Sequence, residues 1–230
     1  MKNLLLQKVH LVLEAVASYG SITINELAEK FAIPLPTMSR LVSDMTEMKL
    51  LERLDYYHVA PAAGLIRLGE CARKNSSLVR KVVPILERFA EKMQMNLLLA
   101  GFDEETMFTI FHRGLTGSGN PIWESGLALV LMKQAKLTQE SCLEMFSRNV
   151  PGASDTEQLV LMRELEEIDK EQMLFRSNTM RQWSCSCGFN CRGLACGFCF
   201  YGLAPECSRE RFVLECSRVL SRINAIFNEE

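Results

Sequence analysis

Residues 21–60, SITINELAEKFAIPLPTMSRLVSDMTEMKLLERLDYYHVA, constrain the fold of this chain more than any other segment. Thr23-Ile24-Asn25-Glu26 has the form of a capping box, in which a hydroxyl satisfies a free amide and a glutamate reaches back. We expect the helix that begins there to end at Ala32-Ile33-Pro34, because proline lacks an amide donor and restricts the preceding residue. A second helix is expected from Pro36-Thr37, with an apolar stripe at helical spacing. That stripe consists of Met38, Leu41, Val42 and Met45.

Two short segments, residues 50–54 and 57–60, flank a turn at Asp55-Tyr56 and predict a hairpin, the wing of a winged helix-turn-helix. Such a motif places the polar face of its second helix in a DNA major groove. The residues expected on that face are Pro36, Thr37, Ser39, Arg40 and Ser43. Arg40 is the candidate for reading guanine, whereas Thr37 and Ser39 suit phosphate contacts. The alternative is a winged helix that contacts protein, with these residues solvated.

The charge distribution gives DNA binding little support. The net charge is −2, and residues 1–60 hold six Lys or Arg against seven Asp or Glu. Residues 61–81 hold Arg67, Arg73, Lys74, Arg80 and Lys81 against Glu70 alone. We therefore expect part of the phosphate contacts to come from this following segment.

Outside the winged motif, the pattern predicts an α+β chain. Helices are expected over residues 4–19, 62–75, 77–93, 123–135, 138–147, 155–173 and 208–228. Strands 96–102, 106–111, 182–188 and 194–202 can form one antiparallel sheet, with turns at 103–105 and 189–193. The expected domains are a winged helix-turn-helix over 1–60, a linker helix over 61–76, and an effector-binding domain over 77–230.

Composition favours a globular regulator. Hydrophobic residues make up 48% of the chain and charged residues 23%, which argues against disorder. Polar residues interrupt the first apolar stretch, which therefore suits an amphipathic helix better than a signal peptide. No stretch is long enough to span a membrane, so we expect a cytoplasmic protein with reduced cysteines. No catalytic motif or phosphate loop is visible, so we expect neither an enzyme nor a bound cofactor.

The order of these parts resembles the IclR-type transcription regulators over nearly the whole chain. The segment SITINELAEKFAIPLPTMSRLVSDMTEMKLLER matches their winged helix, and Leu65-Ile66-Arg67-Leu68-Gly69 is similar to their linker helix. Leu78–Met95 with Asn96–Gly101 resembles the first helix and strand of their GAF-like effector domain, and Pro121–Leu131, Leu159–Asp169 and the 182–202 hairpin follow in order. The resemblance implies a DNA-binding transcription regulator controlled by a small molecule.

Six of the nine cysteines lie between Cys185 and Cys207, an unusual density. Cys185 and Cys187 should share one strand face, whereas Cys196 and Cys199 should face opposite ways. Depending on the hairpin register, Cys196 would lie beside Cys185 or Cys187. The functional alternatives for this region are a thiol sensor, a soft-metal site or an iron–sulfur cluster, and the simpler interpretation is core packing. We assign no metal ligands.

We expect the effector pocket between the sheet and the helix that follows Pro121. Its predicted wall comprises Trp123, Ser125, Cys185, Cys187 and Cys196. Small side chains from Ala195 to Cys199 should leave room beside the sheet, and thiols favour a weakly polar effector or a soft metal over a dicarboxylate. The apolar residues Leu5, Val9 and Leu13, together with the linker helix, predict a homodimer or tetramer bound to double-stranded DNA.

Overall fold

The computed structural model describes residues 4–103, 105–114 and 121–228. It divides the chain into two compact units, Met1–Asn75 and Ser76–Glu230. The helix α4, which was expected as a separate linker, lies within the first unit. None of the helices in the described part of the chain combines the length and apolar character that a membrane crossing requires.

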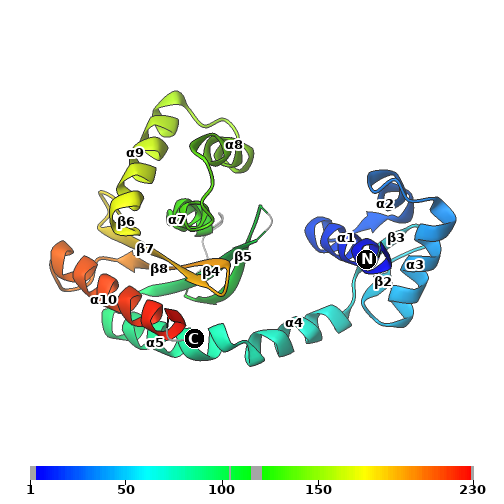
Figure 1. Ribbon diagram of the computed structural model, residues 1–230, viewed down its shortest axis with the longest axis horizontal. Coiled ribbons are helices and arrows are strands. Elements are labelled where there is room, and N and C mark those ends of the chain that lie inside the picture. The colour runs from blue at the N-terminus through cyan, green and yellow to red at the C-terminus, as the bar shows by residue number, and fades with distance from the viewer. Residues whose placement is uncertain (1–3, 104, 115–120, 229–230) are drawn as a thin grey trace. The chain divides into compact units, whose positions relative to one another are not determined.

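The first unit is a winged helix-turn-helix (Figure 1). Its elements are α1 (Leu4–Tyr19), β1 (Ile22–Thr23), α2 (Ile24–Lys30), α3 (Leu35–Glu47), β2 (Leu51–Arg53), β3 (His58–Pro61) and α4 (Ala63–Asn75). The three strands form an antiparallel sheet in the order β1-β3-β2. The strand β1 was not predicted, because two residues are too short to show an alternating pattern.

The two helices of the helix-turn-helix motif begin in different ways. Thr23 and Glu26 form the expected capping box of α2, with the Glu26 amide donating to the Thr23 hydroxyl at 3.2 Å. The helix α3 has no side-chain cap, and a proline in its first turn needs no amide partner there. Met38, Leu41, Val42 and Met45 are its buried residues, so the predicted stripe is confirmed. They pack into a core with Val12, Val16 and Leu27.

The second unit is built on a sheet that, within the described residues, has five strands in the order β5-β4-β8-β7-β6. Its strands are β4 (Asn96–Asp103), β5 (Thr106–Arg113), β6 (Met173–Ser177), β7 (Gln182–Cys191) and β8 (Leu194–Leu203). Its helices are α5 (Ser77–Met93), α6 (Pro121–Glu124), α7 (Leu127–Gln134), α8 (Gln139–Asn149), α9 (Asp155–Glu171) and α10 (Arg209–Asn228). All strand pairs are antiparallel.

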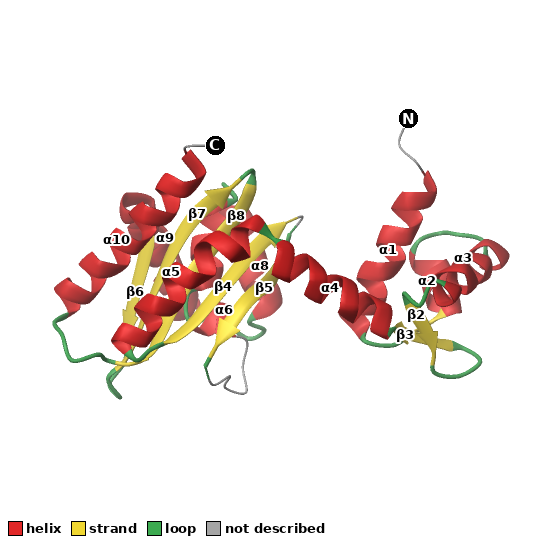
Figure 2. Cartoon of the chain, turned by 90° about the horizontal axis from the view of Figure 1, so that it is seen from below, coloured by secondary structure: helices red, strands yellow, loops and turns green. Residues whose placement is uncertain are grey.

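Helices cover both faces of this sheet (Figures 1 and 2). The α10 face is the one that packs against α5 and α10, and Leu97, Cys185, Cys187, Phe198 and Phe200 project from it. The α7 face packs against α7, with α9 behind it, and Leu98, Ala100, Leu174 and Cys199 project from it. The two faces hold separate hydrophobic cores.

Three predicted boundaries are corrected. The helix expected over 123–135 is two helices, because Gly126, in the left-handed region at φ 78°, separates α6 from α7. The hairpin turn is Arg192-Gly193 alone, and positive φ at both residues gives the tight turn that suits a twisted ribbon. The strand β6 was missed, and it follows α9 after the single residue Gln172. The turn predicted at 103–105 includes residue 104, which lies outside the described residues.

Candidate functional site

The outer face of α3 is the candidate DNA-binding surface. Pro36, Thr37, Arg40 and Ser43 are exposed, and Ser39 is half-buried. The four buried residues of α3 hold the opposite side of the helix against the core. The residues expected on the polar face therefore lie together at the surface, although their roles stay predictions.

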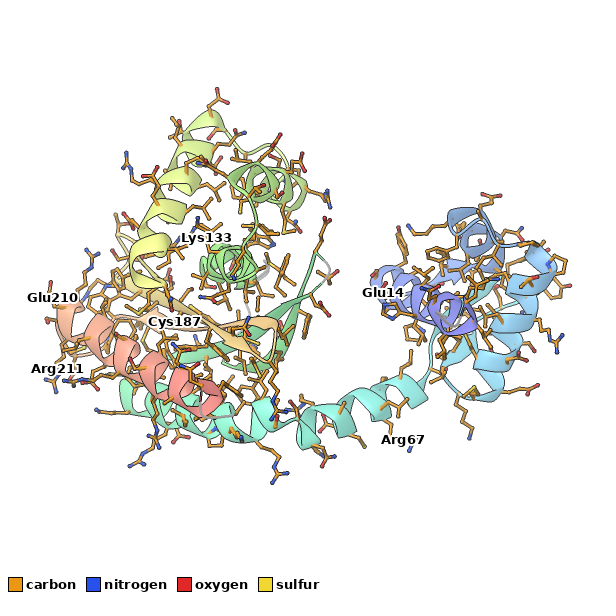
Figure 3. The ribbon with its side chains drawn as sticks, in the orientation of Figure 1. Glu14, Arg67, Lys133, Cys187, Glu210 and Arg211 are labelled. Carbon is orange, nitrogen blue, oxygen red and sulfur yellow. The ribbon has the colours of Figure 1, made fainter. Side chains whose placement is uncertain are left out.

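Charged residues around this surface have both signs. Besides Arg40, α3 exposes Asp44 and Glu47, which would repel phosphates. Positive charge lies on α4, where Arg67 is exposed and projects outward (Figure 3). In the same helix Glu70 pairs with Arg73 at 3.0 Å and with Lys74 at 3.1 Å. Because those two cations are already paired, Arg67 is the cation of α4 better placed for a phosphate contact.

The wing carries aromatic residues that the sequence analysis did not consider. Between β2 and β3, an Asp55 carboxylate oxygen accepts hydrogen bonds from the amides of Tyr57 and His58, each at 2.7 Å. These bonds hold the pKa of Asp55 below its usual value. Tyr56 is 81% exposed at the tip of the turn. The sequence Asp55-Tyr56-Tyr57-His58 carried the signal, since an aspartate often closes a turn on its own backbone.

The predicted effector wall is wrong as a group, because its members lie on opposite faces of the sheet. Cys185, Cys187 and Cys196 belong to the core on the α10 face. Trp123 packs against the core on the α7 face, where Phe146 lies 6.1 Å from it between ring centroids. Ser125 is also on that side, since its carbonyl accepts hydrogen bonds from Ser184 and Ser186. The two sets are therefore separated by the sheet.

The space expected beside the small residues of β8 is filled by α7. A Cβ atom on Gly197 would lie 2.8 Å from Leu127, and one on its partner Gly188 would lie 2.7 Å from Val130. These two glycines therefore allow α7 to approach the sheet closely. Leu127 and Val130 are both fully buried, so α7 fills the space beside these two glycines.

The cysteines of the hairpin are core residues. Cys185 and Cys187 share a face and Cys196 and Cys199 face opposite ways, as predicted. Cys196 is paired across the hairpin with Phe189, so its predicted position beside Cys185 or Cys187 is wrong. Cys187 lies in the interior of its unit (Figure 3). Among the described residues, no group of three or more His, Cys, Asp or Glu side chains is placed to hold a metal ion.

Burial makes these thiols poor nucleophiles. Desolvation raises the pKa of Cys196 and of Cys199 to about 12, and it raises the pKa of Cys187 as well. The pKa of Cys216 on α10 is raised chiefly by its hydrogen bond with Cys185. Thiolate, the reactive form, is thus disfavoured at neutral pH. Neither the thiol-sensor nor the metal alternative gains support from this geometry.

A different cavity, of about 860 Å³, opens at one end of the sheet, and residues from both faces of the strand ends line it. The strand ends β4, β6, β7 and β8 contribute Asn96, Arg176, Ser184 and Tyr201, and the helices α6 and α9 contribute Glu124 and Glu164. Ser125, which follows α6, also lines it and is the one predicted effector residue that does. The size suits a small organic ligand.

Hydrogen bonds fix the walls of this cavity. The Arg176 guanidinium donates from Nε and Nη2 to the carboxylate of Glu164, at 2.8 and 2.6 Å. Its Nη1 donates to the carbonyls of Trp123 and Glu124, at 3.4 and 3.2 Å. Arg176 therefore ties α6 and α9 to the edge strand β6.

The opposite wall is tied by an aromatic pair. The Tyr201 hydroxyl is hydrogen-bonded to Nε2 of His112 on β5, at 2.5 Å, and the two rings stack 6.2 Å apart. Sequence reasoning missed Arg176 because it missed β6. Tyr201 was missed because the hairpin register, which places it, is not visible in the local sequence.

Comparison with known proteins identifies the fold. A model of the MarR family matches residues 3–56. No curated protein matches the chain significantly. Among solved structures, an IclR family transcriptional regulator from Brucella abortus has a TM-score of 0.65 at 17% identity, covering 98% of this chain and 91% of that one.

Two further structures agree. An IclR transcriptional regulator from Alicyclobacillus acidocaldarius has a TM-score of 0.63 at 12% identity, covering 99% and 98% of the two chains. An IclR homolog from Microbacterium hydrocarbonoxydans, complexed with 4-hydroxybenzoate, has a TM-score of 0.61 at 18% identity, covering 98% and 100%. The chain thus has the fold of the IclR-family transcriptional regulators, and the predicted α+β class with its N-terminal winged helix is confirmed.

Proposed function

We propose that this chain is a DNA-binding transcription regulator, not an enzyme, whose operator affinity changes when a small molecule binds in the second unit. The observation that carries the proposal is the exposed face of α3, held by a buried stripe within a winged helix. A rigid helix with a free polar face is what major-groove readout requires. In this proposal Arg40 reads a base, and Thr37 and Ser39 contact phosphates, while Pro36 and Ser43 border the contact.

The DNA-binding part is tested with an operator selected from random duplexes by the intact protein. Arg40→Ala should lower the preference for the selected sequence by about 1–3 kcal/mol, the worth of a bidentate base contact. The matched control is Arg148→Ala, since Arg148 is also an exposed arginine and lies on α8 of the second unit. Tight, sequence-selective binding by Arg40→Ala would show that another residue reads the DNA.

A specific observation also favours a second function, a winged helix that contacts protein. The carboxylates of Asp44 and Glu47 share the exposed side of α3, and residues 1–60 lack a positive excess. The two functions differ in their salt dependence. Binding to random duplex that weakens steeply with added salt supports DNA contact, because phosphate binding releases counterions. Absence of duplex binding at low salt supports protein contact.

For the effector, the cavity at the sheet end replaces the wall predicted from the sequence. It combines polar groups from four strands with a volume that fits a small molecule. It keeps Ser125 and leaves out Trp123, Cys185, Cys187 and Cys196. By binding there, an effector would favour one arrangement of a dimer and change DNA affinity through a coupling free energy.

The effector part is tested by screening metabolites for release of the selected operator. Ser184→Leu, which places a bulky side chain on the cavity floor, should abolish the release caused by any hit. Ser147→Leu is the control, because Ser147 is exposed on α8 and does not line the cavity. Equal release in wild type and Ser184→Leu would place the effector elsewhere.

The dimer part depends on apolar residues that the first unit leaves exposed. Leu4, Leu5 and Leu6 of α1 are each at least 60% exposed, and α4 buries none of its residues although it carries Ile66, 72% exposed. Two-fold pairing would cover such surface. We expect sedimentation at micromolar concentration to give a mass above the 26.1 kDa of one chain, and Ile66→Asp to lower it. A monomeric wild type would contradict this part.

A further inference from the structure

Four polar positions form a single row across the cavity floor. Tyr201 of β8 pairs with Asn96 of β4 on one side and with Ser184 of β7 on the other. Ser184 in turn pairs with Arg176 of β6. Directly paired residues project from the same face of a sheet. On the α7 face this row follows the buried row of Leu98, Cys199, Ser186 and Leu174.

The only cation that lines the cavity, among the described residues, is already neutralised. The Arg176 guanidinium makes a two-pronged ion pair with Glu164, whose side chain is 15% exposed. Its remaining donor group is directed at two backbone carbonyls of α6. Arg176 therefore stabilises the cavity wall, and its charge is not available to a ligand.

Glu124 brings a second carboxylate that has no such partner. It lines the cavity from α6, is exposed, and forms no ion pair with any described residue. Glu124 also acts on Tyr201 in the cavity floor. Burial is the main cause that raises the pKa of Tyr201, and electrostatic interactions with Cys199 and Glu124 raise it further. With two carboxylates and one guanidinium, the lining carries one negative charge in excess.

We propose that the cavity selects its ligand by charge, binding a small amine most tightly, a neutral alcohol less tightly and a carboxylic acid least, and that Glu124 sets this order. The ammonium group would donate to Glu124, while the ligand's remaining polar groups meet Ser184, Tyr201 and Asn96. The inference rests on the proposed effector function. It separates this chain from the similar Microbacterium protein, whose structure contains the carboxylate 4-hydroxybenzoate.

Three probes of one shape test the order. They are 4-hydroxybenzylamine, 4-hydroxybenzyl alcohol and 4-hydroxybenzoate, which carry charges of +1, 0 and −1 at pH 7. Calorimetry with the intact wild type should give about tenfold weaker binding at each step from amine to alcohol to acid. This is the effect expected when the ligand changes by one unit of charge near the Glu124 carboxylate in a partly solvated site. Glu124→Gln should bring the three Kd values together to within about threefold.

The control Glu144→Gln removes an exposed carboxylate from α8, outside the cavity, and should keep the full order. If the acid binds as tightly as the amine, or if the order survives in Glu124→Gln, the inference is overturned. In that case binding of any probe that is lost in Ser184→Leu still supports the effector function. The two failures are therefore distinguishable.

A measurement without a ligand covers the case in which no probe binds. The chain has two tryptophans, and Trp183 lines the cavity, so in the variant Trp123→Phe the fluorescence comes from a residue of the cavity lining. Relative to the quenching of free N-acetyltryptophanamide by each ion, its fluorescence should be quenched more by caesium than by iodide, and adding Glu124→Gln should remove this normalised difference. Equal normalised quenching by both ions before that second substitution, or stronger normalised quenching by iodide, would overturn the charge assignment.

Discussion

The two faces of the five-stranded sheet share the same strands but differ in how their side chains are used. On the α10 face, Cys187, Phe198 and Phe200 are fully buried among the side chains of α5 and α10. On the α7 face, apolar packing stops at the row of Leu98 and Cys199, and a polar row follows that opens into the cavity. Because side chains alternate along each strand, one face serves core packing and the other contributes polar groups to the cavity.

The difference shows that the cysteines of β7 pack the core and do not line the cavity. Cys185 and Cys187 alternate with Ser184 and Ser186 along β7. The thiols point to the packed face, and the hydroxyls point to the face where both donate to the carbonyl of Ser125. A short sulfur side chain fits beneath the helix α10, whereas the site depends on the serines between the cysteines.

The largest contrast is expected between two neighbouring positions of the hairpin. Phe200→Ala should lower the free energy of unfolding by about 3–5 kcal/mol, because it empties a packed position. The Phe200 ring lies 4.6 Å from Phe89 and 5.3 Å from Phe198 between centroids. Ser184 precedes Cys185, the cross-strand partner of Phe200, and projects from the other face. Ser184→Ala should cost about 1 kcal/mol or less, the worth of one partly solvated hydrogen bond.

Urea unfolding followed by tryptophan fluorescence measures both, since both tryptophans lie in the second unit. If Ser184→Ala costs as much as Phe200→Ala, the cavity floor is a packed part of the core and the comparison fails.

A smaller effect is expected for the cysteines. Cys187→Ser should cost about 1–3 kcal/mol, because it places a hydroxyl in an apolar interior. Cys71→Ser, at an exposed position on α4, should leave the stability unchanged. In the native protein, a thiol reagent at pH 8 should modify Cys71 rapidly and leave Cys187 and Cys199 unmodified, because their raised pKa values keep them protonated. Rapid labelling of these two would revive the thiol-sensor alternative.

Local patterns in the sequence were sufficient for most of the fold. The predicted capping box is present at Thr23 with Glu26. Alternation correctly put Cys185 and Cys187 on one face. It did not say which helix covers that face, because the order of helices around a sheet is set by non-local packing. The prediction of the effector pocket was wrong for this reason.

The cavity was beyond prediction for a related reason. Arg176 lies on β6, a five-residue strand that only its pairing with β7 defines. The row of Asn96, Tyr201, Ser184 and Arg176 exists because three registers coincide. Register depends on contacts between distant segments, and one chain contains no local signal for it.

An intermediate effect is expected from the ion pair that ties the cavity wall. Arg176→Met should cost about 1–2 kcal/mol, between the values of exposed and buried pairs, because the Arg176 side chain is 32% exposed. Most of the cost comes from leaving Glu164 without its partner. The double variant Arg176→Met, Glu164→Gln should therefore recover part of the loss. Arg113→Met, which breaks the exposed pair with Glu91, is the control and should cost less.

The smallest effects are expected at the first turns of α9 and α10, where helices on both sides of the sheet carry a carboxyl group with a lowered pKa. Hydrogen bonds from the backbone and hydroxyl of Ser154 lower the pKa of Glu157 on α9, the α7 side. The amide of Glu210 itself and the hydroxyl of Ser208 lower the pKa of Glu210 on α10. A lowered carboxyl pKa contributes stability above the unfolded value of 4.5, which is lost as the pH falls through the folded value.

Glu157→Gln and Glu210→Gln should therefore each be slightly less stable than wild type at pH 7. Both should match it at a pH below the folded pKa, where the wild-type carboxyls are protonated. The urea midpoint of the second unit, measured across this range, gives both differences. Equal behaviour of the two variants would show that charge at the helix starts is independent of the face each helix covers. A deficit that persists in acid for Glu157→Gln alone would instead mean that α9 depends on this side chain for packing, and that the cavity side of the sheet is the more fragile one.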